Sequence, residues 1–211
     1  MKIAIISGGT PPGLDLLKQE VVDCIYLIGA DGGANCLCDY ALFPHLVIGD
    51  LDSIKPSALK IIKKNNIPIE QYSENKDCTD TQLALHKAIA FGATEIVFLG
   101  CTGGDRIDHF FGNVGLLLIC LKHNIKACIK DAYNIITILD KNITINGSKG
   151  EIFSLHAYSD AVTNLSITGA KFDLSNYDLE LGNPLTLSNE FLNMPVRIDF
   201  ERGKLLLIRQ L

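Results

Sequence analysis

Apolar residues gather in short β-branched runs that alternate with helix-like patterns up to about residue 131. Such runs predict strands, and apolar side chains repeated at three- and four-residue steps predict helices between them. The expected strands are 2–7, 24–30, 46–48, 95–99 and 126–129, and the expected helices are 14–22, 33–40, 56–65, 80–91 and 106–122. This alternation indicates a mostly parallel sheet with right-handed crossovers and flanking helices.

The helix expected at 106–122 has the strongest pattern. Its apolar stripe consists of Ile107, Phe110, Phe111, Val114, Leu117, Leu118 and Leu121. We expect this stripe to face the sheet, because an amphipathic helix buries its apolar side. Arg106, His109 and Asn113 would then share a polar face in the first two turns.

Beyond about residue 133 strand-like alternation replaces the helical spacing. The expected strands are 144–145, 152–156, 162–168, 196–200 and 205–208, and glycine-containing turns at 147–150 and 202–204 suit hairpins. The predicted fold class is therefore α/β, with an N-terminal mostly parallel sheet flanked by helices and a small C-terminal antiparallel β-sandwich. We expect domains 1–131 and 132–211 to pack closely, since no linker-like segment separates them.

Charge and hydropathy argue against some classes of binding partner. The net charge of −5 argues against nucleic acid and anionic membranes, which require a basic face. The longest apolar segment, 114–121, is far shorter than the ~20 residues of a membrane-spanning helix. The opening residues lack the pattern of a signal peptide. We expect a soluble protein.

The cysteines indicate a reducing compartment. All seven lie between Cys24 and Cys128, most of them inside apolar runs, so a disulfide framework is not expected. They form no C-x-x-C pair and have no metal-ligand spacing with the histidines, which argues against zinc. We expect a cytoplasmic protein, in which the glycosylation sequons at 142–144 and 164–166 are chance matches.

Aspartates follow or precede the predicted elements at three places. Asp31 follows strand 24–30, Asp50 and Asp52 follow strand 46–48, and Asp77 and Asp80 precede helix 80–91. The ligand crevice of an open parallel sheet lies beyond the carboxyl ends of its strands, so these carboxylates should converge there. Their mutual repulsion calls for a cation, and carboxylates combined with phosphates suit Mg²⁺.

Each acidic cluster also has a simpler interpretation. Aspartate and glycine at a strand end are common turn formers. Thr79 with Gln82 fits a capping box, and Asp80 at the first helical position would be stabilised by the helix dipole without a metal. The magnesium interpretation therefore depends on the joint placement of the clusters and on the next motif.

A glycine-rich segment joins strand 95–99 to helix 106–122. Gly100, Gly103 and Gly104 allow close approach of a ligand, and the helix N-terminus offers free N–H groups to phosphate. Arg106 can clamp two phosphate oxygens, and Asp108 can orient it or accept from a ribose or substrate group. The alternative is a simple glycine turn with an Asp105 cap and a surface Arg106–Asp108 pair.

Absent motifs exclude other classes. The sequence has no G-x-x-x-x-G-K-[ST] loop, no G-x-G-x-x-G fingerprint and no G-x-S-x-G elbow. P-loop kinases, typical dinucleotide enzymes and serine hydrolases are therefore not favoured.

Five segments, in order, resemble the motif series of thiamine pyrophosphokinases: DGGAN at 31–35, GDLDS at 49–53, KDCTDT at 76–81, TGGDRIDH at 102–109 and SNEF at 188–191. The resemblance covers essentially the whole chain. It implies a homodimer with an ATP-binding catalytic domain and a thiamine-binding β-sandwich, with thiamine in a cleft at the dimer interface. The implied reaction is Mg²⁺-dependent transfer of pyrophosphate from ATP to the thiamine hydroxyl, giving thiamine diphosphate and AMP.

The resemblance also implies residue roles. Catalysis is assigned to Asp50, Asp52, Asp80, Arg106 and Asp108, of which Asp50, Asp52 and Asp80 are the magnesium ligands. The ATP site comprises Asp31, Gly32, Asp77, Thr79, Gly103, Gly104 and Arg106, and the thiamine site comprises Ser188, Asn189, Phe191 and His109. Phe191 is equally compatible with a core aromatic. The general base stays open among Asp31, Asp77 and Asp108.

The sequence departs from the family pattern at a few positions. Cys78 and Cys101 replace other apolar residues, Leu187 stands where threonine is more usual, and there is no tryptophan to stack on thiamine. Two alternative functions stay open: a pyrophosphokinase acting on another alcohol, such as a hydroxymethyl pterin, and a nucleotide-binding regulator without catalysis. The complete acidic set argues against the regulator.

Overall fold

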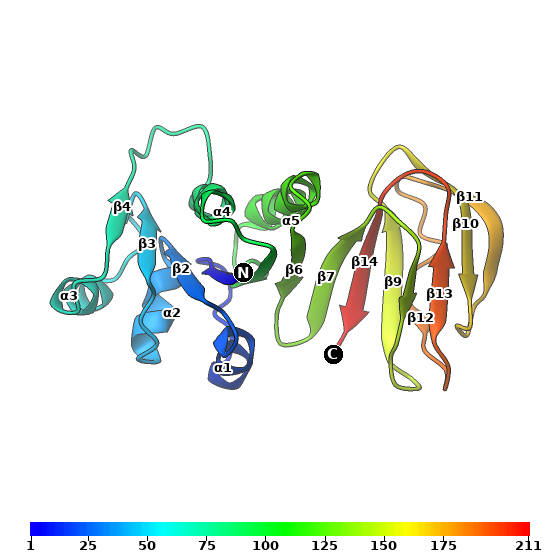
Figure 1. Cartoon of the computed structure of the whole chain (residues 1–211), viewed down its shortest axis with the longest axis horizontal. Helices are drawn as coiled ribbons and strands as arrows, with labels where there is room; N and C mark the ends of the chain where they lie inside the picture. The colour runs from blue at the N-terminus through cyan, green and yellow to red at the C-terminus, as the bar shows by residue number, and fades with distance from the viewer. The chain divides into compact units, whose positions relative to one another are not determined.

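The computed structural model describes residues 1–211, and the chain divides into two compact units, Met1–Ala132 and Tyr133–Leu211. In Figure 1 the first unit runs from blue to green and the second from green to red. The fold class expected from the sequence is confirmed. None of the helices combines the length and hydropathy that a membrane span requires.

The first unit is a parallel sheet with strand order β6-β5-β1-β2-β3-β4. Its strands are β1 Lys2–Ile6, β2 Tyr26–Ala30, β3 Leu46–Gly49, β4 Ile69–Gln71, β5 Glu95–Leu99 and β6 Lys126–Lys130. Its helices are α1 Leu14–Val21, α2 Gly33–Asp39, α3 Pro56–Lys64, α4 Asp80–Ala90 and α5 Ile107–Lys122. Figure 1 shows α1, α2 and α3 on one side of the sheet and α4 and α5 on the other. Strands β2, β3 and β4 are added on one side of β1, and strands β5 and β6 are added on its other side.

Burial on both faces explains the strand composition. The central strand β1 is almost wholly apolar, and Ile3, Ile5 and Ile6 have no exposed surface. Its neighbours β2 and β5 bury four of their five residues each. A parallel sheet covered by helices on both faces favours such continuous apolar strands over alternating ones.

The orientation predicted for α5 is partly wrong. Ile107 and Phe111 are 71% and 66% exposed, whereas Asn113 is buried. The buried face of this helix consists of Asn113, Val114, Leu116, Leu117 and Cys120. Apolar residues occupy more than half of the helix circumference, so their spacing alone does not select the buried side. Asn113 can turn inward because its side chain finds a hydrogen-bond partner there.

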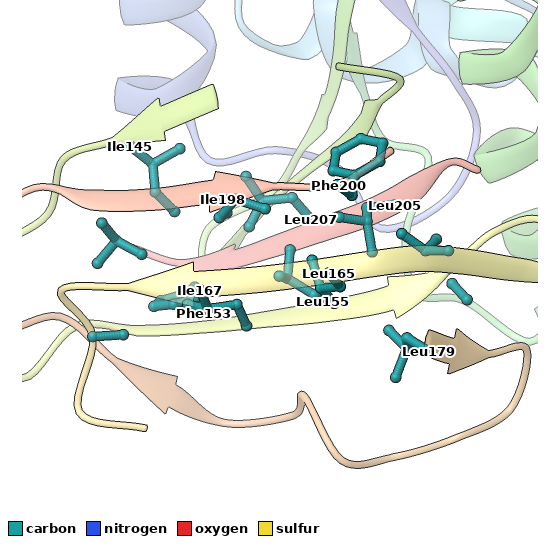
Figure 2. Close-up of a cluster of buried hydrophobic side chains, with 14 of the residues drawn as sticks. Ile145, Phe153, Leu155, Leu165, Ile167, Leu179, Ile198, Phe200, Leu205 and Leu207 are labelled. Carbon is teal, nitrogen blue, oxygen red and sulfur yellow. The ribbon is translucent and has the colours of Figure 1, made fainter. Parts of the chain in front are cut away.

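The second unit is built of two antiparallel sheets, with strand orders β12-β9-β14-β7 and β11-β10-β13-β8. The strands are β7 Asn134–Leu139, β8 Ile143–Ile145, β9 Ile152–Ala157, β10 Ala161–Thr168, β11 Leu174–Glu180, β12 Asn189–Glu190, β13 Val196–Asp199 and β14 Leu205–Gln210. Figure 2 shows Phe153 and Leu155 in one cluster with Leu165, Ile167 and Ile198 from the other sheet. This cluster is the core of the sandwich.

Four strands were not expected from the sequence: β4, β7, β11 and β12. β4 and β12 are only three and two residues long. β11 exposes most of its residues and pairs with β10 through register shifts, so it lacks a regular alternation. β7 reads NIITIL, an apolar run without alternation at the point where the helical pattern stops.

Candidate active site

A cavity of about 600 Å³ opens where the parallel strands end. It is lined by segments that follow β1, β2 and β5 and by the residues that precede α4 and begin α5. These lining residues include Ser7, Gly8, Gly9, Asp31, Gly32, Lys76, Asp77, Thr79, Asp80, Gly103, Gly104, Arg106 and His109. The segments after β1 and β5 leave the sheet toward opposite faces. Open α/β sheets bind their ligands at the point where two such neighbouring connections diverge.

Glycines let two of these segments pack together. The backbone N–H of Gly9 donates to the carbonyl of Gly100 at 2.8 Å, and Thr10 N–H donates to the Thr102 carbonyl at 2.9 Å. A Cβ atom at Gly9 would lie 2.6 Å from the Gly100 oxygen. Gly103 has φ +67°, and a Cβ there would lie 2.1 Å from the Thr10 hydroxyl. One wall of the cavity is therefore formed by two backbone segments that pack directly against each other, which glycine allows.

Three carboxylates meet at the ends of β2 and β3. Asp31, Asp50 and Asp52 each offer an oxygen, and these oxygens lie within 4.8 Å of one another. Asp31 and Leu51 both have left-handed backbones, with φ of 43° and 72°. Non-glycine residues rarely adopt this conformation, and such outliers concentrate at functional sites. We call Asp31, Asp50, Asp52 and the adjacent Asp80 the acidic group.

Asp31 is the most buried member of the acidic group. Only 8% of it is exposed, and its Oδ1 atom is buried without a hydrogen-bond partner. Burial raises the pKa of Asp31, against the lowering effect of hydrogen bonds from Gly32 and Ser53. An unpartnered buried carboxylate oxygen is costly unless a cation sits beside it. The acidic group therefore fits a divalent cation bound through oxygen ligands.

An ammonium group links Asp80 to Asp50. Lys76 Nζ lies 2.6 Å from Asp50 Oδ2 and 3.0 Å from Asp80 Oδ1. The second contact is electrostatic only, since Asp80 Oδ1 has no hydrogen bond of acceptable geometry. The Lys76 hydrogen bond holds the pKa of Asp50 below its usual value. The structure thus brings Asp31 together with Asp50 and Asp52, and places Asp80 across Lys76 from Asp50.

Hydrogen bonds fix Asp80 and the loop after β3. The Thr79 hydroxyl accepts from Gln82 N–H at 3.2 Å, so Thr79 caps α4 and Asp80 is its first residue. The Asn35 carboxamide spans the loop: its Nδ2 donates to the Ser53 carbonyl at 2.9 Å, and its Oδ1 accepts from Lys55 N–H at 2.8 Å.

Arg106 and Asp108 form a forked pair at the other side of the cavity. Arg106 donates from Nε to Asp108 Oδ1 at 3.1 Å and from a terminal nitrogen to Oδ2 at 2.8 Å. This pairing lowers the pKa of Asp108 to about 2. Both side chains are well exposed, so the pair is free to open toward an anion. Arg106 itself is the N-cap residue, and no Asp105 side chain caps the helix.

A buried polar network supports the cavity floor. Ser7 Oγ and Thr81 Oγ1 are 2.9 Å apart and link the end of β1 to α4. The Cys101 thiol donates to Ser7 Oγ at 3.3 Å. Asn113 Nδ2 donates to the Cys101 carbonyl at 3.1 Å. Asn113 therefore joins α5 to the glycine-rich segment. It lines the same cavity as Arg106 and His109, as their shared face predicted, but it is buried whereas they are exposed.

Three residues of the expected thiamine site lie in the second unit. Ser188 is exposed, has a left-handed backbone with φ 54° and donates its N–H to Ser154 Oγ. Asn189 is buried, with its side chain bonded to both backbone groups of Phe172. Phe191 has no exposed surface and packs against Phe153, with ring centroids 4.9 Å apart. The position of Phe191 favours the core interpretation over stacking on a ligand.

Sequence reasoning missed the partners that fix the expected site residues. Lys76 was visible beside Asp77, but its pairing with Asp50 joins residues 26 positions apart. Ser7 is the last residue of the expected strand 2–7, so the rule that placed aspartates at strand ends could also have found Ser7. Nothing in the local pattern indicated the contacts of Asn35 or the inward orientation of Asn113.

Two family models match the chain, "Thiamin pyrophosphokinase, catalytic domain" over residues 17–129 and "Thiamin pyrophosphokinase, vitamin B1 binding domain" over residues 137–205. The chain is 33% identical over 210 residues to a Thiamine pyrophosphokinase of Bacillus subtilis, covering 98% of this chain and 97% of that protein. It is 24% identical over 173 residues to Thiamin pyrophosphokinase 1 of Caenorhabditis elegans, covering 78% and 71%.

Solved structures agree with these relatives. The crystal structure of Thiamine pyrophosphokinase from Bacillus subtilis has a TM-score of 0.89 at 32% identity and covers 100% of this chain and 99% of that one. Thiamin pyrophosphokinase from Geobacillus thermodenitrificans has a TM-score of 0.86 at 29% identity, covering 100% and 98%. A family model that matches more than half of the chain, and a relative above 30% identity along nearly all of it, show that the chain belongs to the thiamin pyrophosphokinase family.

Proposed function

We propose that the protein is a Mg²⁺-dependent thiamine pyrophosphokinase that converts ATP and thiamine to AMP and thiamine diphosphate. Family membership supports the activity. The observation that carries the chemistry is the acidic group with its unpartnered Asp31 oxygen, of which Asp31 and Asp80 line the same cavity as the glycine-rich N-terminus of α5. Carboxylates for a cation and N–H groups for phosphate are the two halves of a magnesium-nucleotide site.

Asp50, Asp52 and Asp80 are proposed as magnesium ligands, and the geometry adds Asp31 as a candidate. A bound Mg²⁺ would neutralise phosphate charge and favour displacement at phosphorus. Gly32, Asp77 and Thr79 line the cavity beside these carboxylates and are proposed to contact ATP.

In the reaction the thiamine hydroxyl oxygen forms a bond to the β-phosphorus of ATP. The bond from that phosphorus to the oxygen that bridges the α- and β-phosphates breaks, and AMP leaves with this oxygen. Arg106 lines the cavity with Gly103 and Gly104 and, once released from Asp108, would offset charge on the transferring group. The hydroxyl proton goes to a carboxylate, for which Asp31, Asp77 and Asp108 are the candidates.

Thiamine is proposed to contact His109, which lines the cavity, and Ser188, which is exposed in the second unit. Asn189 would act through the loop that it holds, because its side chain is already bonded to the Phe172 backbone. We also propose that the protein is a cytoplasmic homodimer with no nucleic-acid or membrane partner, consistent with its net charge of −5.

The test incubates the full-length protein with ATP, Mg²⁺ and thiamine and measures AMP and thiamine diphosphate by chromatography. Asp80→Asn is expected to abolish turnover with little change in folding, and Asp15→Asn, an exposed aspartate on α1, is expected to leave turnover unchanged. Full activity of Asp80→Asn would overturn the role of Asp80. AMP release with a hydroxymethyl pterin but not with thiamine would overturn the acceptor, and no AMP release with either would indicate a nucleotide-binding regulator.

A further inference from the structure

We propose that Lys76 is a built-in counter-ion of the acidic group, which occupies the space between Asp50 and Asp80 in the metal-free protein and competes there with the divalent cation. The inference rests on the proposed function, because it takes the acidic group to be the cation site. It concerns what this chain does before any cation is bound.

The position of the ammonium carries the first step. Lys76 Nζ lies 2.6 Å from Asp50 Oδ2 and 3.0 Å from Asp80 Oδ1, so it bridges the end of β3 and the start of α4. The Lys76 and Asp50 side chains are each only 13% exposed. An ion pair this shielded from water is screened far less than the exposed Arg106–Asp108 pair.

The charge balance carries the second step. Asp31, Asp50, Asp52 and Asp80 bring four carboxylates together, and Lys76 is the cation that pairs with two of them. Asp31 Oδ1 has no hydrogen-bond partner, although only 8% of Asp31 is exposed. One ammonium therefore neutralises the group only in part. A divalent ion brings twice the charge and shorter oxygen contacts, and it would take over the same carboxylates.

The surroundings of Lys76 allow the exchange. It belongs to the segment between β4 and α4, where Tyr72, Ser73, Glu74 and Asn75 are all exposed. Its side chain lines the cavity, so a displaced ammonium has open space to enter without unfolding the strands. Lysine suits this role because its charge sits on a flexible stem.

The experiment titrates the full-length protein with Mn²⁺ alone, without nucleotide, and follows free Mn²⁺ by electron paramagnetic resonance. Removing a competing positive charge at this distance should make Lys76→Met bind Mn²⁺ roughly tenfold tighter than the wild type. Thermal unfolding without metal should show a lower Tm for Lys76→Met, and Mn²⁺ should raise its Tm by more than it raises the wild-type Tm.

Two variants keep the test sharp. Lys87→Met removes another lysine of the first unit, paired with Glu70 outside the acidic group, and should leave Mn²⁺ affinity unchanged. Lys76→Gln retains hydrogen bonding without charge and should bind Mn²⁺ tightly, like Lys76→Met, even if the methionine variant folds poorly. Unchanged Mn²⁺ affinity in both Lys76 variants would overturn the inference and leave the proposed function standing. No Mn²⁺ binding by the wild type or by either Lys76 variant would overturn the cation site itself.

Discussion

The side-chain amide of Asn113, in the second turn of α5, donates a hydrogen bond to the backbone carbonyl of Cys101 at 3.1 Å. Through this contact the helix holds the start of the glycine-rich segment in place. Asn113 and Cys101 are both buried, so water cannot replace the bond if it is lost. The cavity wall therefore depends on Asn113, a polar residue on the buried face of α5.

Asn113→Ala is expected to lower the free energy of unfolding by about 1–3 kcal/mol, because a buried carbonyl loses its partner. It should also weaken ATP binding, since the segment after β5 is no longer fixed. Urea unfolding and ATP titration measure the two effects. Asn65→Ala, which removes an exposed side-chain bond at the end of α3, should change stability by less than about 0.5 kcal/mol. Equal stability of the two variants would contradict the prediction.

Two glycine-to-alanine changes in helices should have opposite signs. A Cβ at Gly33 in α2 would lie 1.9 Å from the Ile6 carbonyl oxygen, so Gly33→Ala must push α2 away from β1 and destabilise the protein by about 1–3 kcal/mol or more. A Cβ at Gly112 in α5 meets nothing within 4 Å, so Gly112→Ala should stabilise by up to about 1 kcal/mol. Thermal unfolding checks both, and a destabilised Gly112→Ala would show that this face of α5 is covered in solution.

Asp31→Asn is expected to stabilise the metal-free protein while weakening cation binding. The change removes a charge that is buried beside Asp50 and Asp52 and that has one unpartnered oxygen. Unfolding in EDTA should give a higher Tm for the variant than for the wild type, and Mn²⁺ titration should give a higher Kd. A lower Tm in EDTA would show that Asp31 is held by interactions other than the cation.

Burial should protect the cysteines at mildly alkaline pH. It raises the pKa of Cys101 and of Cys120 to about 12, so the reactive thiolate is roughly 10⁻⁴ of either thiol at pH 8. Raising the pH toward 12 would increase that fraction. We expect iodoacetamide at pH 8 to label the half-buried Cys78 of the cavity wall first, by mass spectrometry, and all seven cysteines only in urea. Labelling of Cys101 as fast as Cys78 would refute this.

Variants at Phe191 and Ser188 should have different effects, the first on folding and the second on thiamine binding. Phe191→Ala removes a fully buried ring that packs against Phe153, at an expected cost of about 3–5 kcal/mol. Ser188→Ala, at an exposed position, should leave stability nearly unchanged and raise the KM for thiamine. Chemical unfolding and steady-state kinetics distinguish the two variants. An unchanged KM would remove Ser188 from the thiamine site.

Most of the first unit could be predicted because its strands are apolar along their whole length and its helices have clear boundaries. β5 Glu95–Leu99 matches its expected range, and α4 begins at Asp80 as the cap signal at Thr79 indicated. The short edge strand β4 and the exposed strand β11 lack the buried positions that make a pattern visible. Prediction was weakest where apolar residues are abundant, as on α5, because a long apolar surface does not say which side is covered.

The site was predictable as a location more than as a set of contacts. The rule that ligands bind beyond strand ends brought Asp31, Asp50 and Asp52 to one rim, and the structure places their oxygens within 4.8 Å. The positions of Lys76 and Asn35 could not be predicted, because their contacts join segments that only the folded chain brings together.

All strands of the first unit are parallel, so their amino ends share the rim opposite to the cavity. Gly92, in the turn that leads into β5, lies at that opposite rim with a left-handed backbone and open space around it. Reporter groups or short peptide insertions introduced beside Gly92 would leave the nucleotide end of the sheet untouched. The protein could thus be immobilised or labelled from its far edge while the cavity stays open for ligand measurements.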